Sequence, residues 1–338
     1  MNNSHVSIVS ETTDIPKILD LLNITEEIIT EVTNKAFQKI EEIALEYNCI
    51  IFGGYIRDKI NKTTPSDIDL CFKLKKSIYE DEKYKEFDNF IKVIRNIKEF
   101  NNIKQECNHG KYHLFPNIDR IIKLTITLVL GNIPFVHDGI KLNINVDILC
   151  ISHDVDIEPP FKHLDMSCNA LIETSAGIRL SRHTGVQILD ELSDENRIII
   201  TAEIIKLIKK SKGYLIFNYD PSNVNIQEVS LRRFLKIRPK IKFLNLPFGE
   251  QLYNKDEGKC KIPHCSTEYT SLTNVLYTEC KIKNIYCENC MIQYLAKQHE
   301  NFKQGYHNEL VCPYKVKIDF TLCKEKFIDF VKNILNEL

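Results

Sequence analysis

Two aspartates, two positions apart, are the first candidates for chemistry in this sequence. Asp67 and Asp69 lie in the run Asp67–Leu74, whose alternation of polar and apolar residues predicts a β-strand. Alternate residues of a strand point to one face, so both carboxylates would lie on the same side of a sheet. Such a pair repels itself unless a hard cation lies between the carboxylates. The pair therefore indicates a Mg²⁺ site of the kind that phosphoryl or nucleotidyl transfer uses.

A pair of glycines upstream predicts a phosphate-binding loop. The apolar run Cys49–Phe52 predicts a buried strand, Gly53 and Gly54 follow it, and Tyr55–Ile60 predicts a short helix. Glycine lets the backbone approach a ligand closely, and the start of a helix presents unpaired N–H groups to phosphate oxygens. The alternative is an ordinary Gly-Gly turn beside an acidic strand end. The two features together favour nucleotide binding.

These residues also resemble a known signature. Gly53-Gly54-Tyr55-Ile56-Arg57-Asp58, with Asp67-Ile68-Asp69 nine positions after Asp58, resembles the head domain of the class II tRNA nucleotidyltransferase (CCA-adding enzyme) and bacterial poly(A) polymerase family. That family belongs to the polymerase-β nucleotidyltransferase superfamily, and its pattern reads G-G-x-V-R-D and then D-x-D. The segment Leu164–Leu171 resembles the family's R-R-D-F-T-I-N-A-L segment. The resemblance covers Ile50–Leu171, about a third of the chain.

The resemblance implies roles for individual residues. The nucleotide would be bound by Gly53, Gly54, Arg57, Asp58 and Asn169. Two Mg²⁺ would be bound by the catalytic carboxylates Asp67, Asp69 and Asp147. Asp147 is the candidate for the superfamily's third carboxylate because it is the acid in the strong strand pattern downstream, and the alternative is a strand-edge aspartate. In the implied reaction, the 3′-OH of an acceptor, RNA by family resemblance, attacks the α-phosphate of an NTP (ATP or CTP), and pyrophosphate leaves.

Two departures from the family pattern keep a second hypothesis open. His163-Leu164 replaces the paired arginines, and the base-reading motif E-D-x-x-R has no clear match in Arg197–Tyr214. Neither the nucleotide nor the acceptor is therefore fixed by the sequence. The alternative is a catalytically inactive, nucleotidyltransferase-like scaffold that acts through its C-terminal module. The presence of both Asp67 and Asp69 favours the enzyme.

The twelve cysteines are unevenly distributed, and a downstream cluster predicts a structural Zn²⁺ site. Its ligands would be a Cys-x4-Cys pair and a Cys-x2-Cys pair about twenty residues apart: Cys260, Cys265, Cys287 and Cys290. With Cys280 and Cys312, the segment weakly resembles a RING-like module with an incomplete second site, which implies a protein or nucleic-acid partner. The alternative is a set of buried free thiols. Single cysteines in apolar runs, such as Cys49 and Cys150, are predicted to be packing residues.

A short basic stretch is the candidate for contact with a nucleic-acid acceptor. The chain as a whole has 45 Lys and Arg, 46 Asp and Glu and a net charge of −1, which excludes a uniformly basic coat. Binding must therefore be local. The stretch interleaves apolar residues with Arg232, Arg233, Lys236, Arg238, Lys240 and Lys242. The alternative is a solvated helix face.

The length predicts two or three domains, and the predicted elements together with the family resemblance imply an α+β protein. The 338 residues, 43% hydrophobic and 27% charged, are typical of globular chains. We expect a nucleotidyltransferase head with a mixed sheet and flanking helices, a mainly helical neck, a zinc module and a terminal amphipathic helix, over 1–171, 172–248, 249–320 and 321–338. No apolar run reaches the ~18 residues of a membrane span. No secretory signal is visible at the N-terminus, so the many cysteines indicate a reducing compartment, the cytoplasm or the nucleus.

The periodicity of apolar residues predicts the principal elements. A first helix is expected to begin after an N-cap at Asn23 or Thr25 and to end near Tyr47. Further helices are expected over 80–100, 203–212, 227–237 and 324–338. Strands are expected over 121–130 and 142–152. The pattern from 170 to 244 is expected to be mostly helical.

Overall fold

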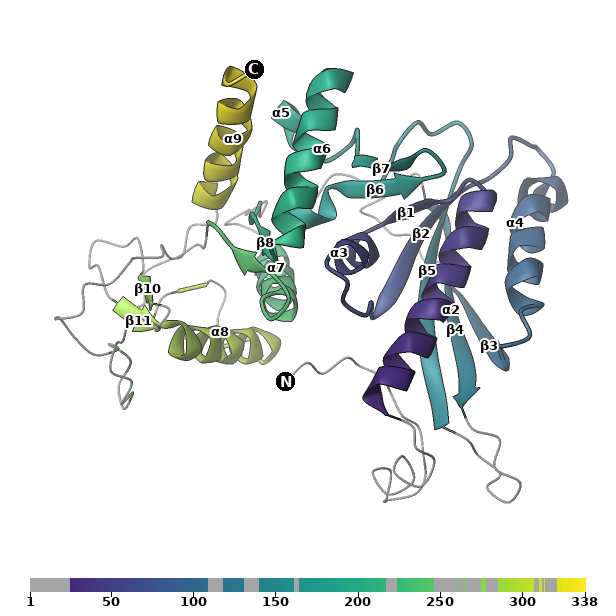
Figure 1. Cartoon of the computed structure of the whole chain (residues 1–338), viewed down its shortest axis with the longest axis horizontal. Coiled ribbons are helices and arrows are strands. Elements are labelled where there is room, and N and C mark those ends of the chain that lie inside the picture. Colours follow the sequence, from purple (N-terminus) through teal and green to yellow (C-terminus); the bar gives the residue numbers. More distant parts are fainter. Residues whose placement is uncertain are drawn as a thin grey trace. The chain divides into compact units, whose positions relative to one another are not determined.

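The structure is a computed structural model in which the chain forms two compact units (Figure 1). The first comprises Met1–Lys162 and Cys168–Thr201, and the second comprises His163–Ser167 and Ala202–Leu338. The boundary falls within helix α6 (Asp194–Lys209). The four-part division expected above stays a prediction. The structure describes residues 25–108, 118–130, 140–160, 164–216, 224–245, 260, 262, 265, 275–277, 285–306, 310–311, 313 and 321–338.

The first unit is built on a mixed seven-stranded sheet in the order β3-β4-β5-β2-β1-β6-β7. Only β2 and β5 run parallel to each other; the other neighbours in this described sheet are antiparallel. The strands are β1 (Ile50–Phe52), β2 (Asp67–Lys73), β3 (Asn102–Asn108), β4 (Ile118–Leu130), β5 (Ile140–Ile151), β6 (Leu171–Thr174) and β7 (Gly177–Leu180). Together with the flanking helices, this sheet confirms the predicted α+β class.

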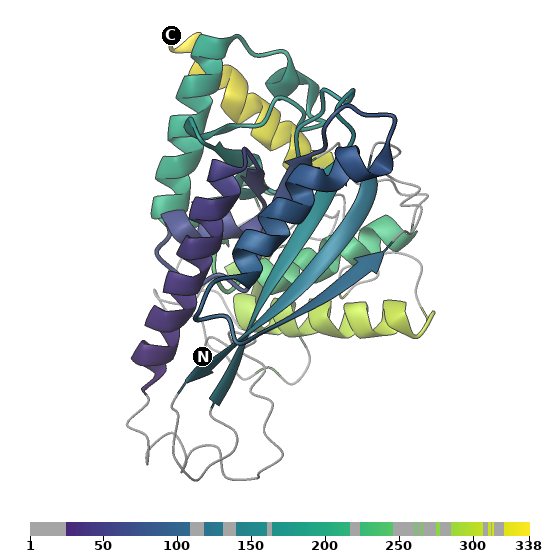
Figure 2. The same ribbon diagram turned by 90° about the vertical axis from the view of Figure 1, so that its right-hand side faces the viewer.

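Two long helices cover one face of this sheet, as Figure 2 shows for α2 and α4. The N-cap of α2 is Thr25, whose hydroxyl accepts a hydrogen bond from the N–H of Ile28. The helical elements of this unit are α2 (Glu26–Glu46), α3 (Gly54–Ile60), α4 (Glu80–Arg95), the 3₁₀ turn η1 (Ser167–Asn169), α5 (Gln187–Asp190) and the first half of α6. The predicted helices over 25–47 and 80–100 are thereby confirmed, although α4 ends at Arg95.

The core of the first unit lies between these helices and the sheet. Alternate residues of the long strands are buried on this face, namely Ile122, Leu124, Ile126 and Leu128 of β4 and Leu142, Ile144, Val146 and Ile148 of β5. Phe72 of β2 packs against Phe87 and Phe90 of α4, with ring centroids 5.3 and 5.6 Å apart. Because strand side chains alternate, the opposite face carries the polar residues of the same strands.

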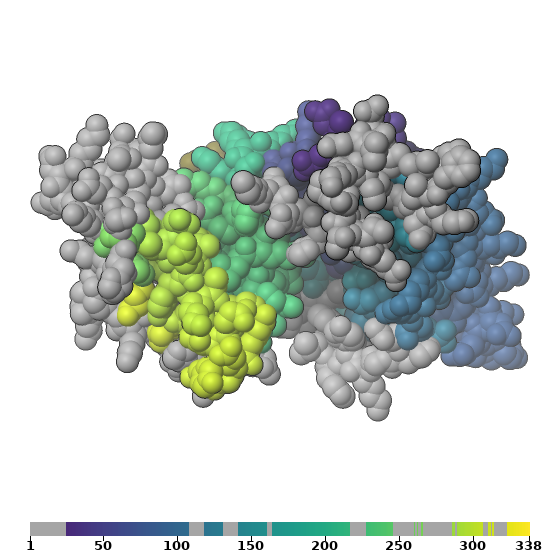
Figure 3. Space-filling model, turned by 90° about the horizontal axis from the view of Figure 1, so that it is seen from below, coloured from purple at the N-terminus to yellow at the C-terminus, as the bar shows by residue number. Residues whose placement is uncertain are grey.

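The second unit contains mostly helices and short strands. They are β8 (Lys212–Gly213), α7 (Val224–Ile237), β9 (Lys242–Phe243), β10 (Val275–Tyr277), β11 (Ile285–Cys287), α8 (Glu288–Lys303) and α9 (Thr321–Asn336). The ring of Tyr214 stacks on Phe330 of α9 at 4.6 Å, and the Asn245 amide donates to the carbonyl of Cys323. The exposed residues of α8 reach the surface in Figure 3 (yellow-green). Among the described helices, none has both the length and the apolar run that crossing a membrane requires.

The expected helical pattern from 170 to 244 is wrong for its first part. Residues 171–180 form the β6–β7 hairpin, which turns through Gly177 at a φ of +107°. Four-residue strands are too short for periodicity to distinguish from a helical turn, so the error has a physical reason. Strand β3 was also not expected, because its residues are mostly exposed and polar and it is held by pairing with β4 rather than by burial.

Candidate functional site

The three candidate carboxylates lie on two adjacent strands. Asp67 and Asp69 are at the start of β2, and Asp147 is on β5. In the parallel β2–β5 pair, Asp69 is the register partner of Asp147. The three residues belong to the polar face of the sheet, because their neighbours Ile68 and Val146 are fully buried on the other face. The structure thus brings together residues that are 78 positions apart, and their catalytic role stays a prediction.

Each of two carboxylates has a polar partner. Ser66 Oγ donates to Asp67 Oδ1 at 2.9 Å, and Lys123 Nζ lies 3.5 Å from Asp147 Oδ2. Within the described residues, the one group of three or more side chains close enough to share a metal ion consists of four cysteines, so the three carboxylates do not form such a group. Uncompensated carboxylates repel each other, so an open spacing is expected without a cation. In ligand type and register, the three aspartates fit a Mg²⁺ site.

The glycine loop directly contacts one of these carboxylates. Gly53 has a φ of +77°, and a Cβ at this position would lie 2.6 Å from Asp69 Oδ2. Both the left-handed backbone and the close approach disfavour a larger residue, which would have to displace the Asp69 carboxylate. Phe52, the residue before Gly53, pairs with Asp69 in the antiparallel β1–β2 register. The loop and the carboxylate therefore form one local structure.

A buried ion pair follows the loop on α3. Arg57 and Asp58 are 3% and 2% exposed, and Arg57 Nε and Nη2 donate to the Asp58 carboxylate at 2.8 and 2.9 Å. Burial alone would lower the pKa of Arg57, but the charge and hydrogen bonds of Asp58 outweigh it and raise the pKa. Arg57 Nη1 is also buried and has no hydrogen-bond partner among the described residues. A buried donor without a partner is costly, so a bound anion such as a phosphate would suit this position.

The last predicted nucleotide-binding residue, Asn169, is buried in η1. Its Oδ1 lies 3.8 Å from the Sγ of Cys168, and Cys168 is close enough to affect the pKa of Arg57. The segment Leu164–Leu171, which resembles the second family motif, is divided between the two units after Ser167. His163 lies outside the described residues. The role of Asn169 stays a prediction.

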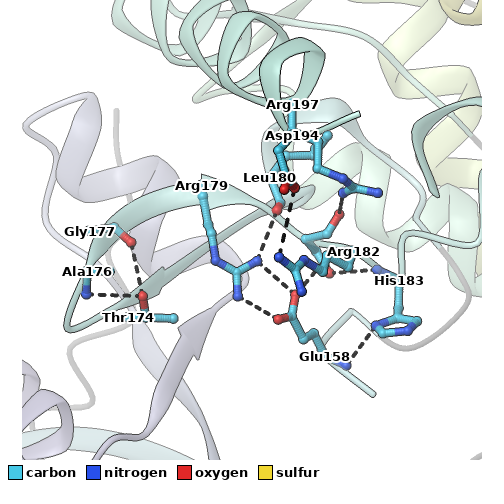
Figure 4. Close-up of polar contacts among 11 residues, drawn as sticks. Glu158, Thr174, Ala176, Gly177, Arg179, Leu180, Arg182, His183, Asp194 and Arg197 are labelled. Atoms are coloured by element: carbon cyan, nitrogen blue, oxygen red, sulfur yellow. Dashed lines mark hydrogen bonds and ion pairs between the residues drawn. The ribbon is translucent and has the colours of Figure 1, made fainter. Parts of the chain in front are cut away.

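Arg197, at the start of the region where the base-reading motif was sought, has a structural role (Figure 4). Its guanidinium donates to four backbone carbonyls, those of Leu192, Ser181, Leu189 and Asp190, at 2.8–3.2 Å. These bonds hold the turn between β7 and α6 together. Because the donors of Arg197 are occupied by the backbone, this arginine is not a candidate for reading a nucleobase.

The four predicted zinc ligands come together in the second unit. The Sγ atoms of Cys260, Cys265, Cys287 and Cys290 all lie within 4.8 Å of one another, and those of Cys265 and Cys287 are 3.9 Å apart. Tetrahedral coordination with Zn–S bonds of ~2.3 Å places sulfurs ~3.8 Å apart, so the cluster is consistent with zinc. Cys287 ends β11 and Cys290 is in the first turn of α8. Cys280 and Cys312, considered for a second site, lie outside the described residues.

The predicted basic stretch begins on α7 and continues to β9. Arg232, Arg233 and Lys236 are exposed, whereas Arg238, Lys240 and Lys242 are half-buried. The interleaved apolar residues Phe234, Ile237, Ile241 and Phe243 are buried, so the stretch has one basic side and one packed side. Arg233 forms an ion pair with Asp165. Nucleic-acid binding by this stretch stays a prediction.

Sequence reasoning missed Lys123, the cross-strand neighbour of Asp147. The register of β4 against β5 pairs these two residues across the sheet. Their sequence separation carries no signal for this contact, since register depends on the whole β-hairpin. The β-branched residues of Ile121–Leu130 predicted a strand there, but not the strand with which it pairs.

Fold and site together define an α+β protein with a mixed sheet, a carboxylate group beside a glycine loop and a four-cysteine cluster that could hold a metal. No protein-family model and no curated protein matches the chain. Among solved structures, the chain is similar to one described as the complex of a CCA-adding enzyme with CTP, with 16% identity and a TM-score of 0.26. The match covers 68% of this chain and 50% of that one, so this chain spans about half of that enzyme. A likeness this weak assigns no activity.

Proposed function

We propose that the first unit is a Mg²⁺-dependent nucleotidyltransferase that adds nucleotides from an NTP, ATP or CTP, to the 3′-OH of an RNA acceptor. The observation that carries the proposal is the register pairing of Asp69 with Asp147, directly beside Gly53. A glycine loop against one carboxylate, with a second carboxylate on the adjacent strand, is the arrangement that binding a triphosphate next to a metal requires. The G-G-x-x-R-D and D-x-D residues of the sequence support the same function.

The residues of the chain divide the task between them. Without side chains, Gly53 and Gly54 let the loop backbone approach Asp69 and Arg57 closely, beside the position proposed for the phosphates. The buried guanidinium of Arg57 supplies a positive charge and the Nη1 donor. Asp67, Asp69 and Asp147 would hold Mg²⁺, which stabilises the attacking and leaving oxygens when it is bound. Asp58 keeps the Arg57 side chain in place. Lys123 compensates the charge of Asp147.

The proposal is tested with purified protein, each labelled NTP in turn, Mg²⁺ and short RNAs. We expect incorporation by the wild type and its loss in Asp67→Ala and Asp69→Ala, with unchanged thermal unfolding. Asp88→Ala, at an exposed position of α4, is the matched control and should remain active. Absence of incorporation with every NTP and acceptor would exclude the enzyme. Full activity of Asp147→Asn would exclude only the third carboxylate.

We also propose that the four-cysteine cluster binds one structural Zn²⁺. Burial raises the pKa of Cys260 and of Cys290, so the thiols would resist ionisation unless a cation compensated their charge. Zinc supplies that charge and would connect β11 and α8 to the segment containing Cys260 and Cys265. Metal analysis of protein purified without chelator should give at least one zinc per chain. A lower content would exclude this site.

A second function is favoured by one observation, the cysteine cluster itself. In a catalytically inactive scaffold, the zinc module would bind a protein or nucleic acid, and the first unit would have no turnover. The incorporation assay separates the two hypotheses.

RNA contact by the basic stretch is tested separately. The double variant Arg232→Gln/Lys236→Gln should reduce the slope of log affinity against log salt by about 1.4, or ~0.7 per phosphate contact on a single strand.

A further inference from the structure

Strand β5 carries a graded row of polar side chains, of which the proposed reaction uses only Asp147. Lys141, Asn143, Asn145 and Asp147 are alternate residues, so they share the polar face of the sheet. The residues between them, Leu142, Ile144 and Val146, are almost fully buried. Along this row the side chains change from acidic at the metal position to neutral amides and then to a cation.

The amides are fixed by hydroxyls on the neighbouring strand. Thr127 Oγ1 donates to Asn143 Oδ1 at 3.1 Å, and Thr125 Oγ1 donates to Asn145 Oδ1 at 3.4 Å. Each bond occupies one lone pair of an amide oxygen and leaves the N–H groups of the exposed Asn145 side chain for a ligand. Asn145 is exposed, and its amide nitrogen has no hydrogen-bond partner among the residues that the structure describes.

Asparagine is an unfavourable choice for these positions. It is depleted in strands, where β-branched residues are preferred, and β5 is an interior strand between β4 and β2. Two asparagines at successive positions of one face, next to an aspartate, therefore cost stability. A binding role for the amides explains why that cost is tolerated.

The chemistry of transfer indicates which ligand lies there. In an in-line displacement, the attacking and leaving oxygens are on opposite sides of the phosphorus. The glycine loop follows β1, on one side of Asp69, whereas β5 and β4 lie on its other side. If the leaving pyrophosphate lies at the loop, the attacking hydroxyl comes from the side of β5.

We propose that Asn143 and Asn145, positioned by Thr127 and Thr125, bind the 3′-terminal nucleotides of the acceptor strand. This inference rests on the proposed function and names the surface that receives its acceptor. Same-face residues of a strand are ~6.7 Å apart, so the two amides lie roughly 7 and 13 Å from Asp147. They can donate to base or ribose oxygens without adding charge beside the carboxylates. Lys141, at the next position, supplies a cation for a backbone phosphate.

The test compares the double variant Asn143→Ala/Asn145→Ala with the wild type, using an RNA trinucleotide as acceptor. Loss of two or more hydrogen bonds should raise the KM for the trinucleotide about tenfold, while the KM for NTP stays within about twofold. Asn34→Ala, at an exposed position of α2, is the matched control and should change neither constant. Thermal unfolding of the control should match that of the wild type, and the double variant should still unfold cooperatively.

Binding is measured in parallel by fluorescence anisotropy of a labelled trinucleotide, without NTP. Weaker binding by the double variant supports the acceptor surface even if the wild type shows no turnover, in which case only the proposed function fails. Equal trinucleotide binding by variant and wild type overturns the surface, whatever the turnover. An equal increase in the KM for NTP also overturns it, because the amides would then contact the nucleotide.

Discussion

Arg57 and Asp58 are sequence neighbours that are buried together, and each is the main reason that the other is tolerated inside the protein. The pair makes two hydrogen bonds and leaves one guanidinium donor for a ligand. Two adjacent charges on a short helix are a local feature, which is why the sequence motif alone indicated them. What the motif could not indicate is their burial.

Arg57→Ala should destabilise the first unit more than a surface change would. It removes the guanidinium that compensates the buried Asp58 carboxylate, a change that costs about 3–5 kcal/mol in the free energy of unfolding. Urea denaturation measures this cost. The double variant Arg57→Ala/Asp58→Asn should recover part of it, because no uncompensated charge remains. A single-variant cost below about 1 kcal/mol would contradict the described burial.

Glu158 predicts an acid dependence of stability. Burial would raise the pKa of this carboxyl, but the hydrogen bonds from the Arg179 side chain and the Arg182 backbone, with the charges of both arginines, lower the pKa (Figure 4). A carboxyl with a lowered folded-state pKa stabilises the fold above its unfolded pKa of about 4.3, and this stability is lost as the pH falls through the folded pKa.

Glu158→Gln should therefore reduce stability above pH ~4.3 and flatten its decrease in acid. Loss of hydrogen bonds to a charged group costs about 1.5–3 kcal/mol, and the urea midpoint between pH 3 and 7 measures it. Glu191→Gln, at an exposed position after α5, serves as the control and should keep the wild-type profile. Parallel pH profiles for Glu158→Gln and the wild type would refute the role of this carboxyl.

At the scale of secondary structure, the turn from β1 into α3 fixes the position of Gly53 beside Asp69. Gly53→Ala should therefore impair both stability and activity. The left-handed backbone costs on the order of 1–2 kcal/mol with a Cβ, and that Cβ must also displace Asp69. A displacement of this size should lower turnover about 100-fold.

Gly177→Ala is the matched control, because it changes a second glycine with a positive φ. Gly177 also has a positive φ, of +107°, but an added Cβ meets no atom within 4 Å among the described residues. This variant should lose stability without losing turnover. Equal turnover losses in the two variants would show that the contact with Asp69 is not what Gly53 provides.

Local patterns explain which elements the sequence could predict. The apolar periodicity of α2 and α4 and the β-branched residues of β4 and β5 were sufficient, because both signals are local in the sequence. The β6–β7 hairpin and β3 were missed, since they depend on pairing with other strands. The same limit applies to the site: the Asp67 and Asp69 pair and the Cys-x-x-Cys spacing are local, whereas the contact of Lys123 with Asp147 depends on a long-range register.

At the scale of the molecule, the two units present ligands of opposite chemical character. The first offers carboxylate oxygens, which suit Mg²⁺, and the second offers thiolates, which suit zinc. A chelator that is selective for one of these metals should therefore affect one unit and not the other.

A zinc-selective chelator should destabilise only the second unit. Structural zinc contributes directly to folding, so its removal should lower or abolish one calorimetric transition and leave the other unchanged. Cys265→Ser should reproduce the effect without chelator, whereas Cys107→Ser, at an exposed cysteine of β3, should not. A single transition that shifts as a whole would show that the units do not unfold independently.

Strand β3 stands at one end of the described sheet, and its outer edge has consequences for how the protein behaves in concentrated solution. Backbone groups on the outer edge of a terminal strand can pair with a strand of another molecule. Lys104 and Glu106 occupy alternate positions of β3. Any such pairing would bring these two charged side chains against the neighbouring molecule, which protects the edge from association. Replacing both by threonine would remove this protection, so we expect the solubility of the wild-type protein at high concentration to depend on two side chains outside the candidate site.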